Sequence, residues 1–148
     1  MLKLTRKSIC EALLVPEHRM RTWMKLSPFR KRLTSARVAR EFDASDLLLL
    51  AIAQTLEDKY KLRKESLDHI LPPLDEFIRR PLRTTRTGLI FINIKDWQVD
   101  YFSVDTCEHP GIVINLAAEQ ERVARYLGLM PAQDELPFGL QSLIKVNQ

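Results

Sequence analysis

Hydrophobic side chains recur every three or four positions near the start of the chain, which is the period of an amphipathic helix. The pattern predicts a helix over residues 5–14 whose apolar face is formed by Ile9, Cys10 and Leu13. Thr5 is suited to cap its first turn, because a threonine hydroxyl accepts hydrogen bonds from free helical amides. Pro16 cannot continue this helix, since it lacks an amide proton and restricts the preceding residue to an extended conformation.

A second helix is predicted over residues 16–26, with Pro16 in its first turn. Its apolar side is formed by Met20, Trp23, Met24 and Leu26. Two short helices joined by a turn of three to four residues are a helix-turn-helix unit, although a plain helical hairpin gives the same pattern. Leu14 departs from the usual turn, where glycine is common because the backbone often takes a left-handed conformation there.

A basic segment follows the second helix. Residues 27–40 contain five Lys and Arg and no acidic residue, and residues 37–42 alternate as in a β-strand. A basic hairpin directly after a helix-turn-helix is the layout of a winged helix, whose wing lies along the DNA backbone. The alternative interpretation is a disordered basic loop.

A third helix is predicted from about residue 43 to Tyr60. Asp43 or Ser45 can cap it, and a strongly apolar run extends from Leu47 to Leu56. This run predicts a broad buried stripe.

Apolar residues at helical spacing continue over residues 63–80, but Pro72 and Pro73 interrupt them. Proline removes a helical hydrogen bond and clashes with the preceding turn. We therefore expect two helices in this segment, at 63–71 and 73–80.

The pattern changes from a helical period to a period of two after a polar, basic segment between Pro81 and Gly88, which predicts a linker. Strands are then predicted at 89–94, 97–102 and 112–116, and the first two are joined by a tight turn at Lys95 and Asp96. A helix is predicted at 117–127. The tail from Met130 carries apolar residues and is expected to dock on the body.

Together these elements predict an α+β fold of two parts. Residues 1–80 are expected to form a winged helix-turn-helix domain with following helices, and residues 81–88 a linker. Residues 89–148 are expected to form a small α/β module with an antiparallel hairpin. Because a module of about 60 residues is marginal alone, we expect docking or dimerisation. Four aromatic residues either fill its core or form an interface, namely Phe91, Trp97, Tyr101 and Phe102.

The distribution of charge distinguishes the two ends of the chain. The formal net charge is +4 over 148 residues, with 23 Lys and Arg and 19 Asp and Glu. Residues 1–40 hold 11 basic and 2 acidic residues, a balance of +9, and the remaining 12 and 17 leave −5. Such asymmetry indicates a polyanionic partner, most often nucleic acid or an acidic membrane surface.

Several segments together carry a family resemblance, and they cover roughly half of the chain. They are residues 4–13, 15–23, 40–42, 46–50 and 66–70. In order, these segments resemble the first helix, the recognition helix, the end of the wing and the next two helices of MerR-like winged-helix transcription regulators. The resemblance implies a homodimer in which each recognition helix enters a major groove of double-stranded DNA. The usual long dimerising helix is not evident, and no cysteine cluster matches a metal-sensing site.

The residues expected to contact DNA lie in the second helix and the wing. Arg19 and Arg21 can reach guanine or phosphate, while Lys31, Arg32 and Arg37 are suited to phosphate. His18 can approach a base or phosphate, although an exposed, solvated side chain explains it as well. The complete expected set is Glu17, His18, Arg19, Arg21, Thr22, Lys25, Arg30, Lys31, Arg32, Arg37 and Arg40. We expect Trp23 to belong to the core.

No enzyme, metal or cofactor signature is recognised. Cys107 and His109 lack a second ligand pair, and neither a phosphate-binding loop nor a hydrolase motif occurs. No apolar run reaches the length of a membrane span. The two cysteines and the lack of a secretory signal favour the cytoplasm.

The expected function is sequence-specific regulation of transcription, with helix 16–26 reading the major groove and the wing, residues 30–42, gripping the backbone. One alternative is a protein-interaction adaptor or inhibitor built on a winged helix. Another is an architectural or excision-type DNA-binding factor of a mobile element. The C-terminal module is also a candidate for binding a protein partner.

Overall fold

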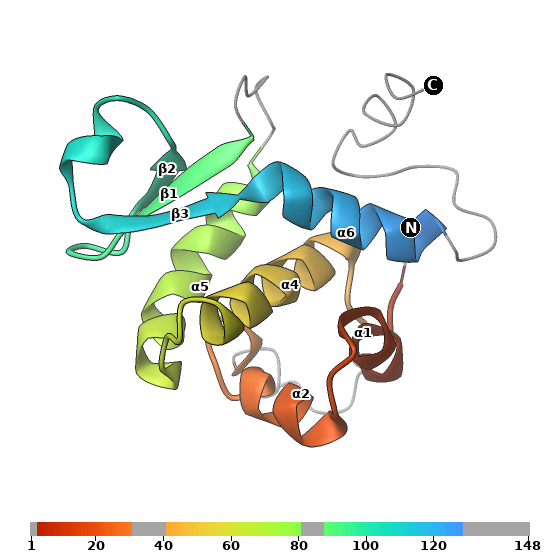
Figure 1. Ribbon diagram of the computed structural model, residues 1–148. Helices are drawn as coiled ribbons and strands as arrows, with labels where there is room; N and C mark the ends of the chain where they lie inside the picture. The colour runs from red at the N-terminus through yellow and green to blue at the C-terminus, as the bar shows by residue number, and fades with distance from the viewer. Residues whose placement is uncertain (1–2, 31–40, 81–87, 129–148) are drawn as a thin grey trace.

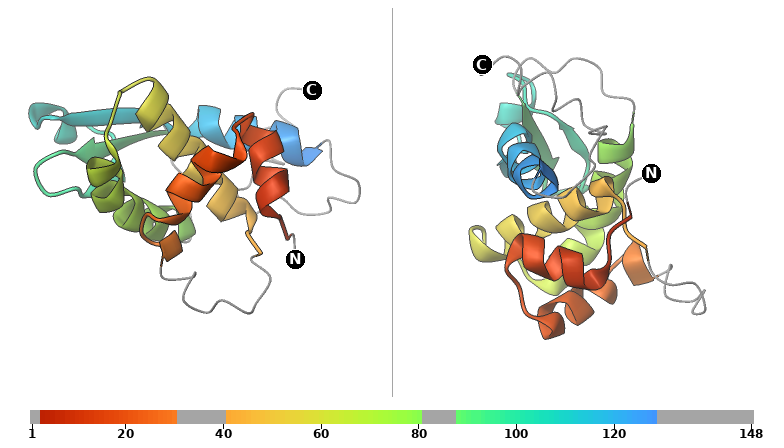
Figure 2. Two further views of the ribbon diagram at one scale, coloured as in Figure 1. Left: turned by 90° about the horizontal axis from the view of Figure 1, so that it is seen from below. Right: turned by 90° about the vertical axis from the view of Figure 1, so that its right-hand side faces the viewer.

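The computed structural model describes residues 3–30, 41–80 and 88–128, which form five α-helices and a three-stranded antiparallel sheet. Helices α1 (Arg6–Leu13) and α2 (Glu17–Met24) form the lowest layer in Figure 1. Helices α4 (Ala44–Asp58) and α5 (Lys64–Arg79) lie in the middle, and α6 (Leu116–Gly128) and the sheet lie above them. The right-hand view of Figure 2 shows the same layers. The predicted α+β class is confirmed.

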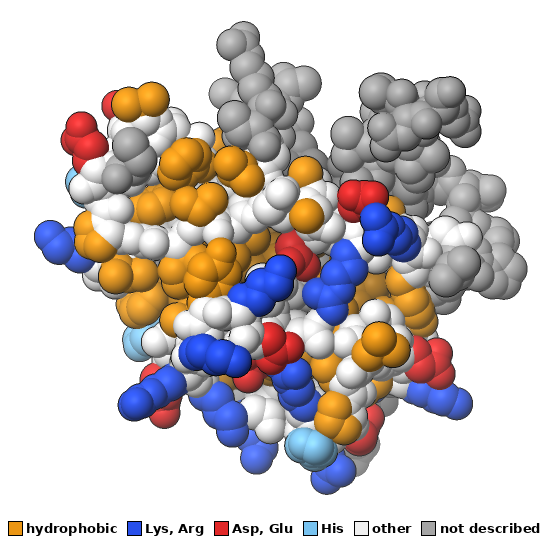
Figure 3. Space-filling view, in the orientation of Figure 1, with side chains coloured by type: hydrophobic (Ala, Val, Ile, Leu, Met, Phe, Trp, Pro, Cys, Tyr) orange, Lys and Arg blue, Asp and Glu red, His pale blue; other side chains and the backbone are white. Residues whose placement is uncertain are grey.

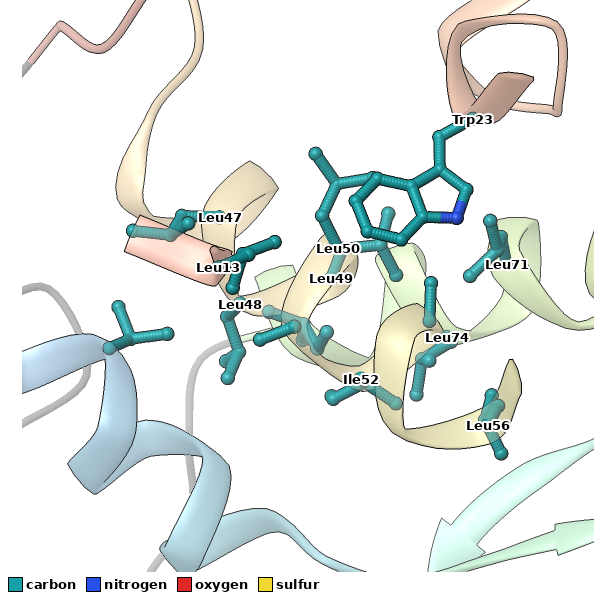
Figure 4. Packing of buried hydrophobic residues seen from close by; sticks show 14 of the residues in the cluster. Leu13, Trp23, Leu47, Leu48, Leu49, Leu50, Ile52, Leu56, Leu71 and Leu74 are labelled. Atoms are coloured by element: carbon teal, nitrogen blue, oxygen red, sulfur yellow. The ribbon is translucent and has the colours of Figure 1, made fainter. Parts of the chain in front are cut away.

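Helix α4 is the centre of the molecule. Its N-terminus carries a capping box, in which the Asp43 carboxylate accepts from the Asp46 amide at 2.8 Å and Asp46 accepts from the Asp43 amide at 3.0 Å. Eight consecutive residues from Leu47 are buried, so the helix is covered on all sides rather than along one stripe. Figure 4 shows the reason, since side chains from α1, α2 and α5 surround those of α4. The helix ends at Asp58, two residues before the predicted end.

Helix α5 is continuous, and the predicted division at its prolines is wrong. Pro72 and Pro73 lie inside the helix. Their lost amides leave two backbone carbonyls without their helical donors. The apolar face compensates for this loss, because six side chains on both sides of the prolines are buried, namely Leu67, Ile70, Leu71, Leu74, Phe77 and Ile78.

The sheet contains β1 (Leu89–Asn93), β2 (Val99–Tyr101) and β3 (Gly111–Asn115), in the order β2-β1-β3. Both neighbours of β1 are antiparallel to it, with Ile90 opposite Tyr101 on one side and Ile114 on the other. A short 3-10 helix, Thr106–Glu108, lies between β2 and β3. The three predicted strands are therefore present.

The turn between β1 and β2 is wider than predicted. The Asn93 amide donates to the Gln98 carbonyl at 2.9 Å, which leaves four residues in the loop rather than Lys95 and Asp96 alone. The Asn93 side chain accepts from the Lys95 amide at 2.8 Å. Trp97 takes a positive φ of 60°, so it belongs to the turn and not to the strand.

The aromatic residues of the hairpin pack on α5. The Trp97 ring stacks on His69 with centroids 5.9 Å apart, and Tyr101 meets the edge of Phe77 at 4.9 Å. Phe91 is buried on the opposite face of the sheet, over Gly111, where a Cβ atom would lie 2.2 Å from the Phe91 ring. These contacts favour the core interpretation of the aromatics.

The C-terminal unit, residues 88–128, shares one hydrophobic core with the N-terminal helices. Ile90, Ile114 and Leu127 belong to the same buried cluster as α4 and α5. Polar contacts join α4 to α6 as well, since Thr55 donates to Glu119 at 2.6 Å and Arg122 donates to Gln54. The docking that the size of this unit predicts is thus observed.

Within the described ranges, no helix combines the length and the apolar character that a membrane span requires. The tail from Met130 lies outside these ranges.

Candidate nucleic-acid interface

Helices α1 and α2 are joined by a short turn, residues 14–16. Thr5 caps α1, because its hydroxyl accepts from the Ser8 amide at 3.1 Å. Leu14 ends the helix in the left-handed conformation, with φ 55° and ψ 47°. Val15 is buried in the turn, and Pro16 precedes the first residue of α2 in an extended conformation.

The Leu14 conformation is unfavourable for a leucine. A side chain with a Cβ atom in the left-handed region costs about 1–2 kcal/mol, and only glycine takes this conformation freely. The Leu14 side chain is also 90% exposed, so no burial offsets that cost. The sequence has a leucine where glycine is usual, and the structure shows that this leucine takes the left-handed conformation.

Helix α2 has one buried face and one exposed face. Met20, Trp23 and Met24 are buried, as predicted, and Figure 4 shows the Trp23 indole beside Leu50 of α4 and Leu71 of α5. His18, Arg21 and Lys25 are exposed, and their spacing of three and four residues places them on one side of the helix. We call these three residues the α2 outer face. Thr22 is half-buried beside them, and its hydroxyl donates to the His18 carbonyl at 3.1 Å.

The α2 outer face is available to a ligand. Within residues 3–30, 41–80 and 88–128, none of its three side chains has an ion pair or a hydrogen bond. The helix ends at Met24, and the Leu26 amide bonds to the Trp23 carbonyl in a tighter last turn. Residues 25–26 of the predicted helix belong to this turn.

Arg19, which the sequence predicts to reach guanine or phosphate, does not lie on the α2 outer face. Its guanidinium donates to both carboxylate oxygens of Asp58, at 2.7 and 3.5 Å, and lies over the Trp23 ring at 5.1 Å. Trp23 Nε1 in turn donates to Glu57. Only 24% of the Arg19 side chain is exposed. Arg19 therefore fastens α2 to the C-terminal end of α4.

Glu17 also has a partner inside the molecule. It forms an ion pair with Arg6 at 3.0 Å and accepts from the Cys10 thiol at 3.7 Å, so it links α2 to α1. Partial burial and the neighbouring Glu17 carboxylate raise the pKa of Cys10. A thiol held in its neutral form is a poor nucleophile.

A second group of cations, not predicted from the sequence, lies in the connection between α4 and α5 and at the first residue of α5. Four of the six residues from 59 to 64 are basic and exposed, namely Lys59, Lys61, Arg63 and Lys64. We call them the α4–α5 basic loop. In the described part of the chain, none of the four forms an ion pair.

The Arg19–Asp58 ion pair holds the α4–α5 basic loop beside α2, because Asp58 immediately precedes Lys59. Figure 3 shows Lys and Arg side chains gathered along the lower part of the molecule, over α2 and this loop. The four basic residues can be found in the sequence. A sum of charge over residues 41–148 does not show them, because acidic residues outnumber basic ones in that segment.

The ends of the predicted wing are described, but most of its basic residues are not. Arg30 is exposed and donates to the Ser27 hydroxyl at 3.1 Å. Phe42 pairs with Leu4 through two backbone hydrogen bonds of 2.7 and 2.9 Å, so the chain returns to the start of α1. The other expected wing residues lie outside the described residues, namely Lys31, Arg32, Arg37 and Arg40.

No cluster of three or more His, Cys, Asp or Glu side chains that could hold a metal ion occurs in the described ranges. In comparisons with known proteins, no family model matches the chain, and no curated protein or solved structure is similar enough to match it.

Proposed function

We propose that the chain is a sequence-specific DNA-binding regulator of transcription, of the MerR-like winged-helix type, and that α2 reads the major groove. The division of α2 into a buried face and a free outer face carries the proposal. An α-helix fits the major groove of B-DNA, and an exposed arginine such as Arg21 can form two hydrogen bonds with a guanine.

The α4–α5 basic loop supports the proposal independently. Phosphate contacts fix the orientation of a protein on the duplex, whereas contacts to base edges select the sequence. Four exposed cations beside α2 supply the charge that such backbone contacts need. The loop then lies beside α2 and holds it against the groove.

The proposal includes a homodimer and a protein contact through the C-terminal unit. Val104 is 82% exposed and Ile94 is 44% exposed, which gives this unit apolar surface for a second copy or a partner. The same observation favours the alternative of an adaptor or inhibitor that binds protein instead of DNA. Both functions are compatible with the fold, so the test must separate them.

The direct experiment is selection of bound duplexes from a random library, followed by affinity measurements at two salt concentrations. We expect a preferred site bound more tightly than bulk DNA by about a thousandfold or more. Arg21→Ala is expected to weaken the preferred site by about 1–3 kcal/mol and bulk DNA much less. Lys61→Ala is expected to weaken both equally and to reduce the salt slope by about 0.9, the value for one phosphate contact.

Arg125→Ala is the matched control, because Arg125 is an arginine on α6 that is 75% exposed and lies outside α2 and the α4–α5 basic loop. It should bind the preferred site like the wild type. Failure to bind any duplex more tightly than bulk DNA, together with partners that survive nuclease treatment, indicates the adaptor function. Selected sites arranged as direct repeats with bending indicate an architectural factor instead of a regulator.

A further inference from the structure

Leu14 differs from the other residues of the described chain that take a positive φ. Three residues other than glycine do so, namely Leu14, Lys61 and Trp97. Trp97 stacks on His69, and its amide donates to the Asn93 carbonyl at 2.9 Å, so packing holds its conformation. Lys61 carries a charged side chain that is solvated where it lies. Leu14 alone combines the left-handed backbone with a large apolar side chain in water.

Both properties of Leu14 are unfavourable in the isolated chain. The left-handed conformation favours glycine, and a 90% exposed leucine gains nothing from burial. The turn that ends α1 requires the left-handed conformation, but it does not require a leucine, since glycine takes this conformation freely. Strained residues of this kind cluster at functional sites. The outlier therefore directs attention to a ligand at the turn.

The position of Leu14 identifies the ligand class. Leu14 lies three residues before Glu17, the first residue of α2, on the turn that leads into the proposed reading helix. His18 of the α2 outer face is one turn further along the chain. Residues 14–18 therefore include the exposed apolar side chain of Leu14 and the exposed polar side chains of Glu17 and His18.

We propose that Leu14 is a specificity-determining contact that meets the C5-methyl group of a thymine at the edge of the site read by α2. This inference rests on the proposed DNA-binding function. The thymine methyl is the apolar group that the major groove offers, and apolar side chains contact it in protein–DNA complexes. Contact with the methyl would bury the exposed leucine.

The test uses the duplex selected by the full-length wild-type chain. Each thymine of that duplex is replaced in turn by deoxyuridine, which lacks only the C5-methyl group. We expect the wild type to lose about fourfold in affinity at one thymine per half-site, which is the value of burying one methyl group. Leu14→Gly is expected to be indifferent to that replacement, and Leu14→Met to retain most of the sensitivity.

Stability measurements accompany the binding data, because Leu14→Gly relieves the left-handed backbone. We expect it to unfold at the same or a higher denaturant concentration than the wild type. Val104→Ala is the matched control, since it shortens an 82% exposed apolar side chain in the C-terminal unit. It should keep the wild-type response to deoxyuridine.

The possible outcomes separate this inference from the proposed function. A wild type that selects a sequence but responds to no deoxyuridine replacement overturns the role of Leu14 and leaves DNA reading intact. The same holds if Leu14→Gly keeps the wild-type response, or loses a protein partner while its DNA binding is unchanged. A wild type without sequence preference overturns both.

Discussion

Arg19 lies on the border between the two faces of α2, and its partners decide which role it has. Its ion pair with Asp58 and its position over the Trp23 ring hold it against α4. Glu57 completes the arrangement, with one oxygen accepting from Trp23 and lying 3.9 Å from Arg19. If α2 reads DNA as proposed, Arg19 is a positioning residue, because its contacts fix the orientation of α2 on α4.

Substitution of either member of the Arg19–Asp58 pair should therefore weaken DNA binding. Arg19→Ala and Asp58→Asn are each expected to lower affinity for the preferred site about three- to fivefold, because a partly exposed ion pair contributes up to about 1 kcal/mol. The salt slope of binding should not change, since no phosphate contact is lost. Equilibrium titrations at several salt concentrations measure both quantities.

Asp58→Asn gives this prediction its sharpest form. It removes a negative charge beside the proposed interface, so simple electrostatics would make DNA binding tighter. Tighter binding by Asp58→Asn, or a reduced slope in Arg19→Ala, would show that Arg19 contacts phosphate directly.

Residue identity alone could not separate Arg19 from Arg21. Helical period divides apolar from polar positions, and it placed Trp23 in the core correctly. Asp58, however, is 39 positions away in the sequence, and only tertiary packing brings it to Arg19. The position of Leu14 in a left-handed turn could be predicted, because that conformation follows from the local geometry of two helices joined by a short turn.

At the scale of elements, the junction of α4 and α5 is held by one arginine. Arg79 donates to Asp43 at 2.9 Å, to Asp46 at 2.7 Å and to Asp75 at 2.9 Å. Partial burial raises the pKa of Asp43, but the hydrogen bonds from Arg79 and from the Asp46 amide outweigh it and hold the pKa below its ordinary value. Asp46 is almost fully buried, and its ion pair with Arg79 joins the N-terminus of α4 to the last turn of α5.

This junction predicts a defined response to acid. A carboxylate with a lowered pKa stabilises the fold above its unfolded-state pKa, near 3.8, and the stabilisation is lost as the pH falls through the folded-state pKa. Arg79→Gln is expected to cost about 1–2 kcal/mol at neutral pH, because charged hydrogen bonds are lost from a side chain that is one-third solvated. Such carboxylates titrate between about pH 5 and pH 2, and over this range the free energy of unfolding of Arg79→Gln should fall less than that of the wild type.

Denaturant unfolding at a series of pH values measures this response. Arg80→Gln is the control, because Arg80 is 61% exposed and its pair with Glu76 spans 3.5 Å on the surface. It should change the free energy of unfolding by less than about 0.5 kcal/mol. Parallel curves for Arg79→Gln and the wild type would contradict the assigned role of the Arg79 junction.

The elements that sequence patterns predict well are those whose signals are local. Thr5 and Asp43 act as caps, and the period of two after Gly88 marks three strands. The errors occur where distant packing opposes a local rule. Pro72 and Pro73 should break a helix, but the buried face on both sides of them holds α5 together. The hairpin turn widens because Trp97 leaves the strand to stack on His69.

At the scale of the whole molecule, the basic surface and the hydrophobic core both extend beyond the segments that the sequence pattern predicts for them. The positive balance of residues 1–40 predicts one basic end, but the α4–α5 basic loop extends the cationic surface into the acidic part of the sequence. The hydrophobic core also includes residues from both sides of the predicted linker, because Leu127 of α6 belongs to the same buried cluster as α4. Composition cannot show either feature, since both depend on which helices lie side by side.

The shared core predicts that α2 and the C-terminal unit unfold together. Leu127→Ala is expected to cost about 2–5 kcal/mol, the usual value for a fully buried leucine. In a Trp97→Phe background Trp23 is the only tryptophan left, so fluorescence reports on α2 while circular dichroism reports on all helices. The two signals should shift together, because a common core makes unfolding cooperative.

Leu14→Ala is the matched control and should shift neither, since that leucine is exposed. If Leu127→Ala changed circular dichroism but not the Trp23 transition, α2 would be stable without α6, and contacts such as that of Arg122 with Gln54 would not be needed to hold the proposed DNA-binding surface in place.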